Sequence, residues 1–237
     1  MEKSKLKAFT FMFKDSDCKY KLFILSSLAF PTAFLSYQGE NLKQIMKGGL
    51  ESALLPVEFI LVLLILTVAC TFLFEGYCCK CTQLVIYANQ KDPEKDLLPK
   101  WENEFWEYSK IGVAFSIGVS LIGLAVALGS ILIVPLLFYA VAYVALKTLF
   151  CVNFKMSEFF AWKKALKLMR NNFGHYISVI LYSIGVYIVF GIIAYLCSLS
   201  YFLVFVGAFV QAYFYLVLAY LRGTLFTTNP EVFFAIE

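Results

Sequence analysis

Residues 111–146 form an apolar block of 36 residues without a single charge, and this block limits the possible folds more than any other feature. A membrane-spanning helix needs about 20 apolar residues, with a range of about 17–25, so the block is too long for one helix. Gly129-Ser130 lies near its middle and is typical of a turn. The block therefore predicts two short helices joined as a hairpin.

The composition of the whole chain extends this prediction. Of the 237 residues, 61% are hydrophobic and 15% are charged, whereas soluble domains carry about a quarter charged residues. We expect one all-α integral membrane domain over residues 1–237, built as three helical hairpins. The predicted transmembrane helices are 22–37, 53–74, 111–128, 131–149, 176–196 and 201–221.

The basic residues set the expected orientation. With six spans, the segments 1–21, 75–110 and 147–175 lie on one side together with Arg222, and they hold 18 of the 20 lysines and arginines. A single span over residues 111–146 would send residues 147–175 to the other side. Because basic residues concentrate on the cytoplasmic side, six spans with both termini in the cytoplasm are predicted.

A direct repeat relates the second and third hairpins. FYAVAYVALKTLF at 138–150 and FYLVLAYLRGTLF at 214–226 share Phe, Tyr, Val and a closing Thr-Leu-Phe. The repeat runs in one orientation, whereas many alternating-access transporters are built from inverted repeats, although parallel ones exist.

Residues 154–173, FKMSEFFAWKKALKLMRNNF, have the periodicity of an amphipathic helix. The expected apolar face holds Phe159, Trp162, Leu166, Met169 and Phe173. Its neighbouring basic face holds Lys163, Lys167 and Arg170. Such a helix can lie in the membrane surface and attract anionic headgroups, or it can be an ordinary connecting helix packed under the bundle. Both interpretations stay open at this point.

The segment from Glu75 to Lys110 is expected to be an acidic loop before the third span. Trp101 and Trp106 lie near its end, followed by Tyr108. Tryptophan is enriched at membrane–water interfaces, so both residues are candidate interface anchors.

An ordered set of short motifs resembles a known family. It consists of FKDSD at 13–17, GY at 76–77, LPKW at 98–101, VPLLFYAVAY at 134–143, the run from Phe159 to Tyr176, and a closing FY…G. The set resembles the prokaryotic membrane family called domain of unknown function 4013, and more distantly the membrane domain of some glycerophosphodiester phosphodiesterases. The resemblance implies a prokaryotic plasma-membrane protein of about six helices, and it implies no activity. The short Gly129-Ser130 turn departs from the family pattern.

Cys78, Cys79 and Cys81 form a cluster at the predicted cytoplasmic end of the second span. A structural zinc site normally needs four ligands, and the remaining thiols and His175 have no spacing that supplies them. Juxtamembrane cysteines are also palmitoylation candidates, while free cysteine otherwise behaves as a small apolar residue. We expect the last of these, with neither a metal nor a cofactor.

Ionisable residues inside the membrane are expensive and mark function. Glu58 lies near the outer end of its predicted span, and Glu75 and Lys147 lie at inner ends, where their side chains are expected to snorkel. Gln211 is the strongly polar residue near a helix centre, where its amide can join two helices. For these positions, packing and interface roles compete with a transport site.

No catalytic motif is present, and a lone histidine excludes a paired-histidine metal site. Two function classes remain. We expect a non-catalytic accessory protein that binds membrane lipids, with a protein partner or a second copy as a further possibility and with no nucleic-acid role. The alternative is a small transporter or channel-like permeation protein.

Overall fold

The computed structural model describes residues 7–37, 57–91, 97–101, 104–128, 133–198 and 203–226. No strand occurs among these residues, so the all-α prediction is confirmed for this part of the chain. Its principal helices are η1 (Phe11–Lys14), α2 (Cys18–Tyr37), α4 (Val57–Lys91), α5 (Phe105–Leu128), α6 (Ile133–Asn153), η3 (Met156–Phe160), α7 (Trp162–Asn171), α8 (Phe173–Ser198) and α9 (Val204–Gly223).

Among the residues described, three helices are long and apolar enough to cross a membrane. They are Leu61–Ala88, Phe173–Cys197 and Val204–Gly223, and a shorter apolar helix covers Val141–Asn153. These helices fit a membrane protein. The predicted turn at Gly129-Ser130 lies outside the described residues, as do Lys43 and Lys47.

The acidic loop predicted from Glu75 was wrong over its first half. α4 does not end at residue 74 but continues to Lys91 as one helix of 35 residues. At a rise of 1.5 Å per residue, its length is about 52 Å, well beyond the roughly 30 Å of a bilayer core. Hydropathy detects where an apolar run ends, but a helix continues as long as its backbone and packing allow.

The amphipathic segment is also divided differently from the prediction. Met156–Phe160 is a 3-10 helix, and the α-helix α7 begins only at Trp162. Phe154, just before this segment, has a φ of 57°, in the left-handed region. Phe159 thereby leaves the expected apolar face of α7 and is fully buried against Phe115 and Phe150.

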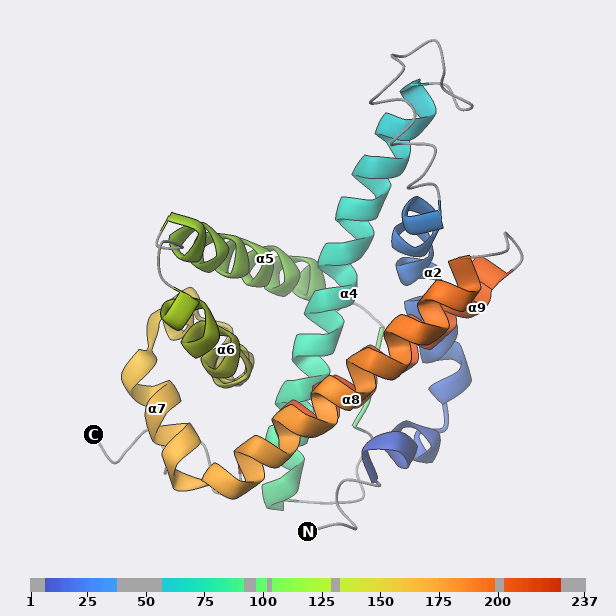
Figure 1. Cartoon of the computed structure of the whole chain (residues 1–237). Helices are drawn as coiled ribbons and strands as arrows, with labels where there is room; N and C mark the ends of the chain where they lie inside the picture. The colour runs from blue at the N-terminus through green and yellow to red at the C-terminus, as the bar shows by residue number, and fades with distance from the viewer. Residues whose placement is uncertain are drawn as a thin grey trace.

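α4 and α9 form the centre of the helix arrangement. In Figure 1, α2 and α9 lie on one side of α4, while α5 and α6 lie on the other. α8 packs along α9, and α6 is surrounded by η3, α7 and α4. The residues that meet at this centre come from every part of the chain, so the centre is where the candidate sites lie.

Two glycines allow α4 and α5 to cross in close contact. A Cβ added to Gly76 would lie 1.9 Å from the Tyr108 carbonyl oxygen, and one added to Gly112 would lie 1.7 Å from the Phe72 carbonyl oxygen. Each glycine therefore faces the backbone of the residue four positions before the other one. Small residues at four-residue spacing are a common means of bringing membrane helices together.

Candidate functional site

An aromatic cluster of Tyr77, Trp101 and Tyr108 forms beside the middle of α4. Trp101 stacks on Tyr77 with ring centroids 4.6 Å apart, and Tyr108 meets both rings edge-on at 5.5 and 5.3 Å. The Tyr77 hydroxyl donates a hydrogen bond to the Pro99 carbonyl at 3.0 Å. This bond ties the segment 97–101 to α4.

A buried ion pair joins the N-terminal motif to the same cluster. Lys21 Nζ lies 2.6 Å from Asp15 Oδ2 and donates to the Leu98 carbonyl at 3.2 Å. Next to this pair is a pocket of about 240 Å³, lined by Asp17, Tyr20, Lys21, Lys100 and Trp101. The structure therefore brings together FKDSD, GY and LPKW, three of the motifs that carry the family resemblance.

The polar atoms of the aromatic cluster have unequal environments. The Tyr108 hydroxyl bonds to the Glu104 carboxylate at 2.6 Å and also to the Lys100 carbonyl. Burial, together with the bond to Glu104, raises the pKa of Tyr108 above its usual range. Among the residues that the structure describes, buried Trp101 Nε1 has no hydrogen-bond partner. The aromatic cluster mainly connects the segment 97–101 to α4 and α5, and the N–H donor of Trp101 is not used in these contacts.

A second group, the charge cluster, consists of the Glu75–Lys147 ion pair between α4 and α6 and of Arg222 on α9, which lies within electrostatic range of both. Lys147 Nζ is 3.1 Å from Glu75 Oε2, and the exposed fractions of the two side chains are 7% and 15%. The ammonium also lies 4.0 Å from the centroid of the Phe115 ring, a cation–π contact. The expectation that both residues snorkel was wrong, because each has a partner on another helix.

Arg222 is the third member of the charge cluster and lies in the last turn of α9. The residue is 7% exposed, and its Nε donates to the Leu218 carbonyl of its own helix at 3.0 Å. Hydropathy missed this position because Arg222 closes an apolar run and reads as a surface residue. The repeat signal could have found it, since Lys147 and Arg222 occur near the ends of the two repeated segments.

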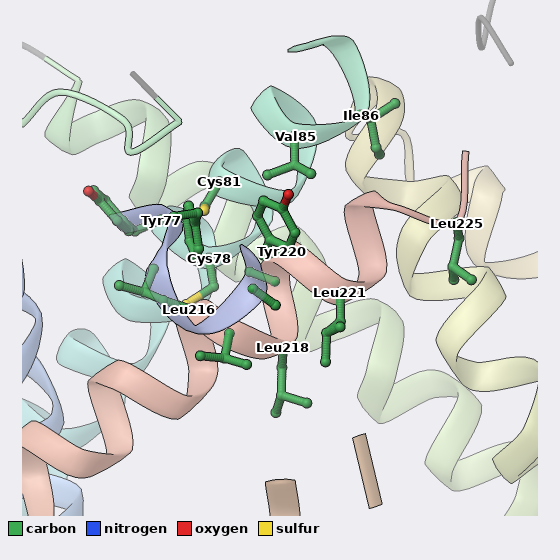
Figure 2. Packing of buried hydrophobic residues seen from close by; sticks show 14 of the residues in the cluster. Tyr77, Cys78, Cys81, Val85, Ile86, Leu216, Leu218, Tyr220, Leu221 and Leu225 are labelled. Atoms are coloured by element: carbon green, nitrogen blue, oxygen red, sulfur yellow. The ribbon is translucent and has the colours of Figure 1, made fainter. Parts of the chain in front are cut away.

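The cysteine cluster is part of the packed core. Cys78, Cys79 and Cys81 are each fully buried, and Cys78 and Cys81 pack among residues of α9 such as Leu216 and Tyr220 (Figure 2). Cys79 packs instead in a separate buried cluster with Phe150 and Cys151 of α6. Among the described residues, no group of three His, Cys, Asp or Glu side chains could hold a metal ion.

The predicted residues of the amphipathic helix separate into two faces. Ala165 and Leu168 are buried, and Trp162 and Met169 pack against the core. Lys163 and Arg170 are exposed, Lys167 is half-buried, and Leu166 is an exposed apolar residue of the same helix, while the exposed Phe173 begins α8. The outer face of α7 therefore combines positive charge with apolar surface.

The remaining candidates lie apart from both clusters. Trp106 is 74% exposed on the first turn of α5, whereas the ring of Trp101 is used inside the protein. Gln211 is half-buried and lines a pocket of about 250 Å³ between α2, α8 and α9. Glu58 belongs to α4, but its side chain lies outside what the structure describes.

Comparison with known proteins adds no further assignment. No protein-family model matches the chain, and neither a curated protein nor a solved structure shows significant similarity to it. The resemblance to domain of unknown function 4013 accordingly stays a prediction, and function has to be argued from the geometry above.

Proposed function

We propose that this chain is a non-catalytic, multi-pass protein of the prokaryotic plasma membrane that associates with anionic lipid. In this proposal α2, α4, α5, α6, α8 and α9 cross the bilayer as six spans, and both termini lie in the cytoplasm. The positive-inside distribution of 18 of the 20 basic residues supports that orientation.

The outer face of α7 is the observation that carries the proposal. Lys163 and Arg170 are exposed on α7 together with Leu166, and Phe173 is exposed at the start of α8, while the opposite face of α7 packs on the protein. A helix with basic and apolar residues on its free face lies in the interface between headgroups and acyl chains. Each lysine or arginine near an anionic membrane surface contributes about 1 kcal/mol of attraction.

An apolar groove between α8 and α9 gives further support. It has a volume of about 550 Å³ and is lined by Phe9, Leu181, Tyr182, Gly185, Val186, Val189, Tyr213 and Phe214. Its walls are almost entirely apolar, and the neighbouring surface of α8 exposes large side chains such as Ile188 and Ile192. Such a groove suits a lipid acyl chain.

The proposal is tested by replacing Lys163, Lys167 and Arg170 with Gln in the full chain. We expect anionic phospholipid to bind the purified variant more weakly, by about 1 kcal/mol for each charge removed, while the thermal unfolding temperature stays close to the wild type. Retention of phosphatidylglycerol in detergent, measured by native mass spectrometry, reads out the binding.

A matched variant controls for net charge. Lys14, Lys100 and Lys110 are also exposed, and replacing them with Gln removes the same charge away from α7. Equal weakening in both triple variants would show that α7 has no special part in lipid binding. Uptake of a solute driven by protons or sodium in reconstituted vesicles would favour transport instead.

A second candidate function, transport or permeation, is favoured by the charge cluster. Buried ionisable residues within membrane helices commonly line ion or substrate paths. The Glu75–Lys147 pair and Arg222 meet that description among the described residues. The sequence had raised a transport site at Glu75 and Lys147 but not at Arg222. We rank this candidate second because none of the three pockets described above is lined by a residue of the charge cluster.

A further inference from the structure

The pocket beside the N-terminal ion pair has a polar lining. It is the cavity of about 240 Å³ described above, and three charged and two aromatic side chains line it: Asp17, Tyr20, Lys21, Lys100 and Trp101. The other two pockets described above are lined mainly by apolar residues. Ligand sites combine a concave surface with a few convergent polar groups, so this pocket is the candidate for a polar ligand.

Lys21 gives the pocket a fixed hydrogen-bond donor. The residue is 5% exposed, and its ammonium lies 2.6 Å from Asp15 Oδ2 and 3.2 Å from the Leu98 carbonyl oxygen. An ammonium has three N–H donors, so within the described part of the chain one of them has no acceptor. Because Asp15 already balances the charge of Lys21, this residue adds a donor to the pocket but little net charge.

Trp101 adds a second donor to the same lining. Its ring stacks on Tyr77 at a centroid distance of 4.6 Å, and Tyr108 meets it edge-on. These contacts hold the ring in place, yet its buried Nε1 has no hydrogen-bond partner among the residues that the structure describes. A buried donor without an acceptor is unfavourable. Lys21 and Trp101 therefore both favour a ligand that carries hydrogen-bond acceptors.

The remaining charges at the pocket have opposite signs. Asp17 and Lys100 are both exposed, and neither forms an ion pair with another side chain in the described part of the chain. A simple anion is attracted by Lys100 and repelled by Asp17, whereas a molecule with both signs can pair with both residues. At about 240 Å³, the cavity lies below the range of about 300–1,000 Å³ that is typical of drug-sized ligands, so this molecule is small.

We infer that this pocket binds a small zwitterion in which a short linker joins a primary ammonium to a phosphate, as in phosphoethanolamine. The ammonium pairs with the Asp17 carboxylate, and the phosphate oxygens accept hydrogen bonds from Lys21 and Lys100. The source is either the headgroup of phosphatidylethanolamine or a free molecule of the same chemistry.

The choice of phosphate as the oxyanion rests on the proposed function. The pocket lies at the start of α2, and in the proposed topology this end of the helix is at the cytoplasmic surface of the membrane, where phospholipid headgroups lie. The pocket itself involves no residue of α7, so the site is separate from the proposed surface for anionic lipid.

Lipid retention by the purified full chain tests the inference. Native mass spectrometry in an uncharged detergent compares short-chain phosphatidylethanolamine with phosphatidylcholine and phosphatidylglycerol of the same chain length. The ammonium of phosphatidylcholine has no N–H donor, and phosphatidylglycerol has no ammonium. We expect the wild type to retain phosphatidylethanolamine more strongly than phosphatidylcholine. Calorimetric titration with soluble phosphoethanolamine examines the free ligand.

The variant Asp17→Asn removes the partner of the ammonium and keeps the size of the side chain. Because Asp17 is exposed, we expect retention of phosphatidylethanolamine to fall by only about two- to fivefold, the range for an exposed ion pair, while retention of phosphatidylglycerol and the thermal unfolding temperature stay unchanged. Glu107→Gln is the matched control, because it removes the same charge from an exposed residue that does not line the pocket.

The results separate the two sources and the two proposals. An effect of Asp17→Asn on phosphoethanolamine binding identifies a free ligand, whereas an effect on phosphatidylethanolamine alone identifies the lipid. The triple variant of α7 should keep the preference for phosphatidylethanolamine over phosphatidylcholine even if it loses no anionic lipid. If Asp17→Asn fails to fold, that preference in the wild type decides. Equal behaviour of Asp17→Asn and Glu107→Gln toward both ethanolamine ligands would overturn the inference.

Discussion

The two halves of α4 have opposite environments. In the N-terminal half, Val57–Phe72, large apolar side chains such as Val62 and Ile65 are exposed, the latter by 70%. In the C-terminal half, Leu73–Lys91, Tyr77, Cys78 and Ile86 are fully buried. The more apolar half of the helix therefore faces outward, and the half with charges, thiols and a tyrosine forms the core.

This difference teaches that hydropathy and burial within the protein are separate properties in such a chain. An apolar surface is stable against lipid, so the N-terminal half needs no protein around it in the proposed membrane setting. Polar groups need partners inside the protein, and the C-terminal half has them. Glu75 pairs with Lys147, and Tyr77 bonds to Pro99.

The largest expected effect follows from breaking the buried ion pair. Glu75→Gln leaves Lys147 charged and without its carboxylate, and we expect a loss of about 3–5 kcal/mol in the free energy of unfolding. The double variant Glu75→Gln with Lys147→Met should recover much of that loss, since it removes both charges. Denaturation in mixed micelles measures both. A single variant as stable as the wild type would show that the pair is not a core interaction.

A matched truncation on the same helix tests the comparison directly. Ile86→Ala should lower the free energy of unfolding by about 2–5 kcal/mol, because Ile86 is fully buried and its removal leaves a cavity. Ile65→Ala should change it by no more than about 0.5 kcal/mol, as expected for an exposed position. The same denaturation experiment applies. Similar losses at both positions would mean that the N-terminal half is also covered by protein.

A smaller loss of stability is expected from a substitution at the close crossing of α4 and α5. Gly76→Ala places a Cβ where the Tyr108 carbonyl already lies, so the helices must separate, and we expect a loss of about 1–3 kcal/mol. Gly185→Ala on α8 is the control, because a Cβ there meets no atom within 4 Å. Thermal unfolding of both variants measures the difference. An unchanged midpoint for Gly76→Ala would contradict the crossing.

Several features of the fold could be predicted from sequence. The apolar blocks placed a helix near each predicted span, and composition indicated a membrane protein. The periodicity of residues 154–173 identified an amphipathic helix, although its start was misplaced. The cysteine cluster could also be interpreted as small packing residues, because no complete set of metal ligands accompanied it.

The charge cluster and the aromatic cluster could be predicted less well than these features. Glu75, Lys147 and Arg222 are far apart in sequence, and each lies near the end of an apolar run, where a surface position is the ordinary expectation. The motif residues Tyr77 and Trp101 were noted as parts of a resemblance, yet nothing in the sequence showed that their rings stack.

The sequence by itself determined the class of the protein and the approximate position of its helices, though not all of their ends, because hydropathy and helical periodicity are local properties of the chain. Tertiary structure decided which half of α4 is buried and which charges meet. Those outcomes depend on where the helices cross. Gly76 and Gly112 set one crossing, and Gly223 sets another, where a Cβ would lie 2.6 Å from Val85 of α4. Such contacts depend on the relative placement of distant segments, which no local pattern contains.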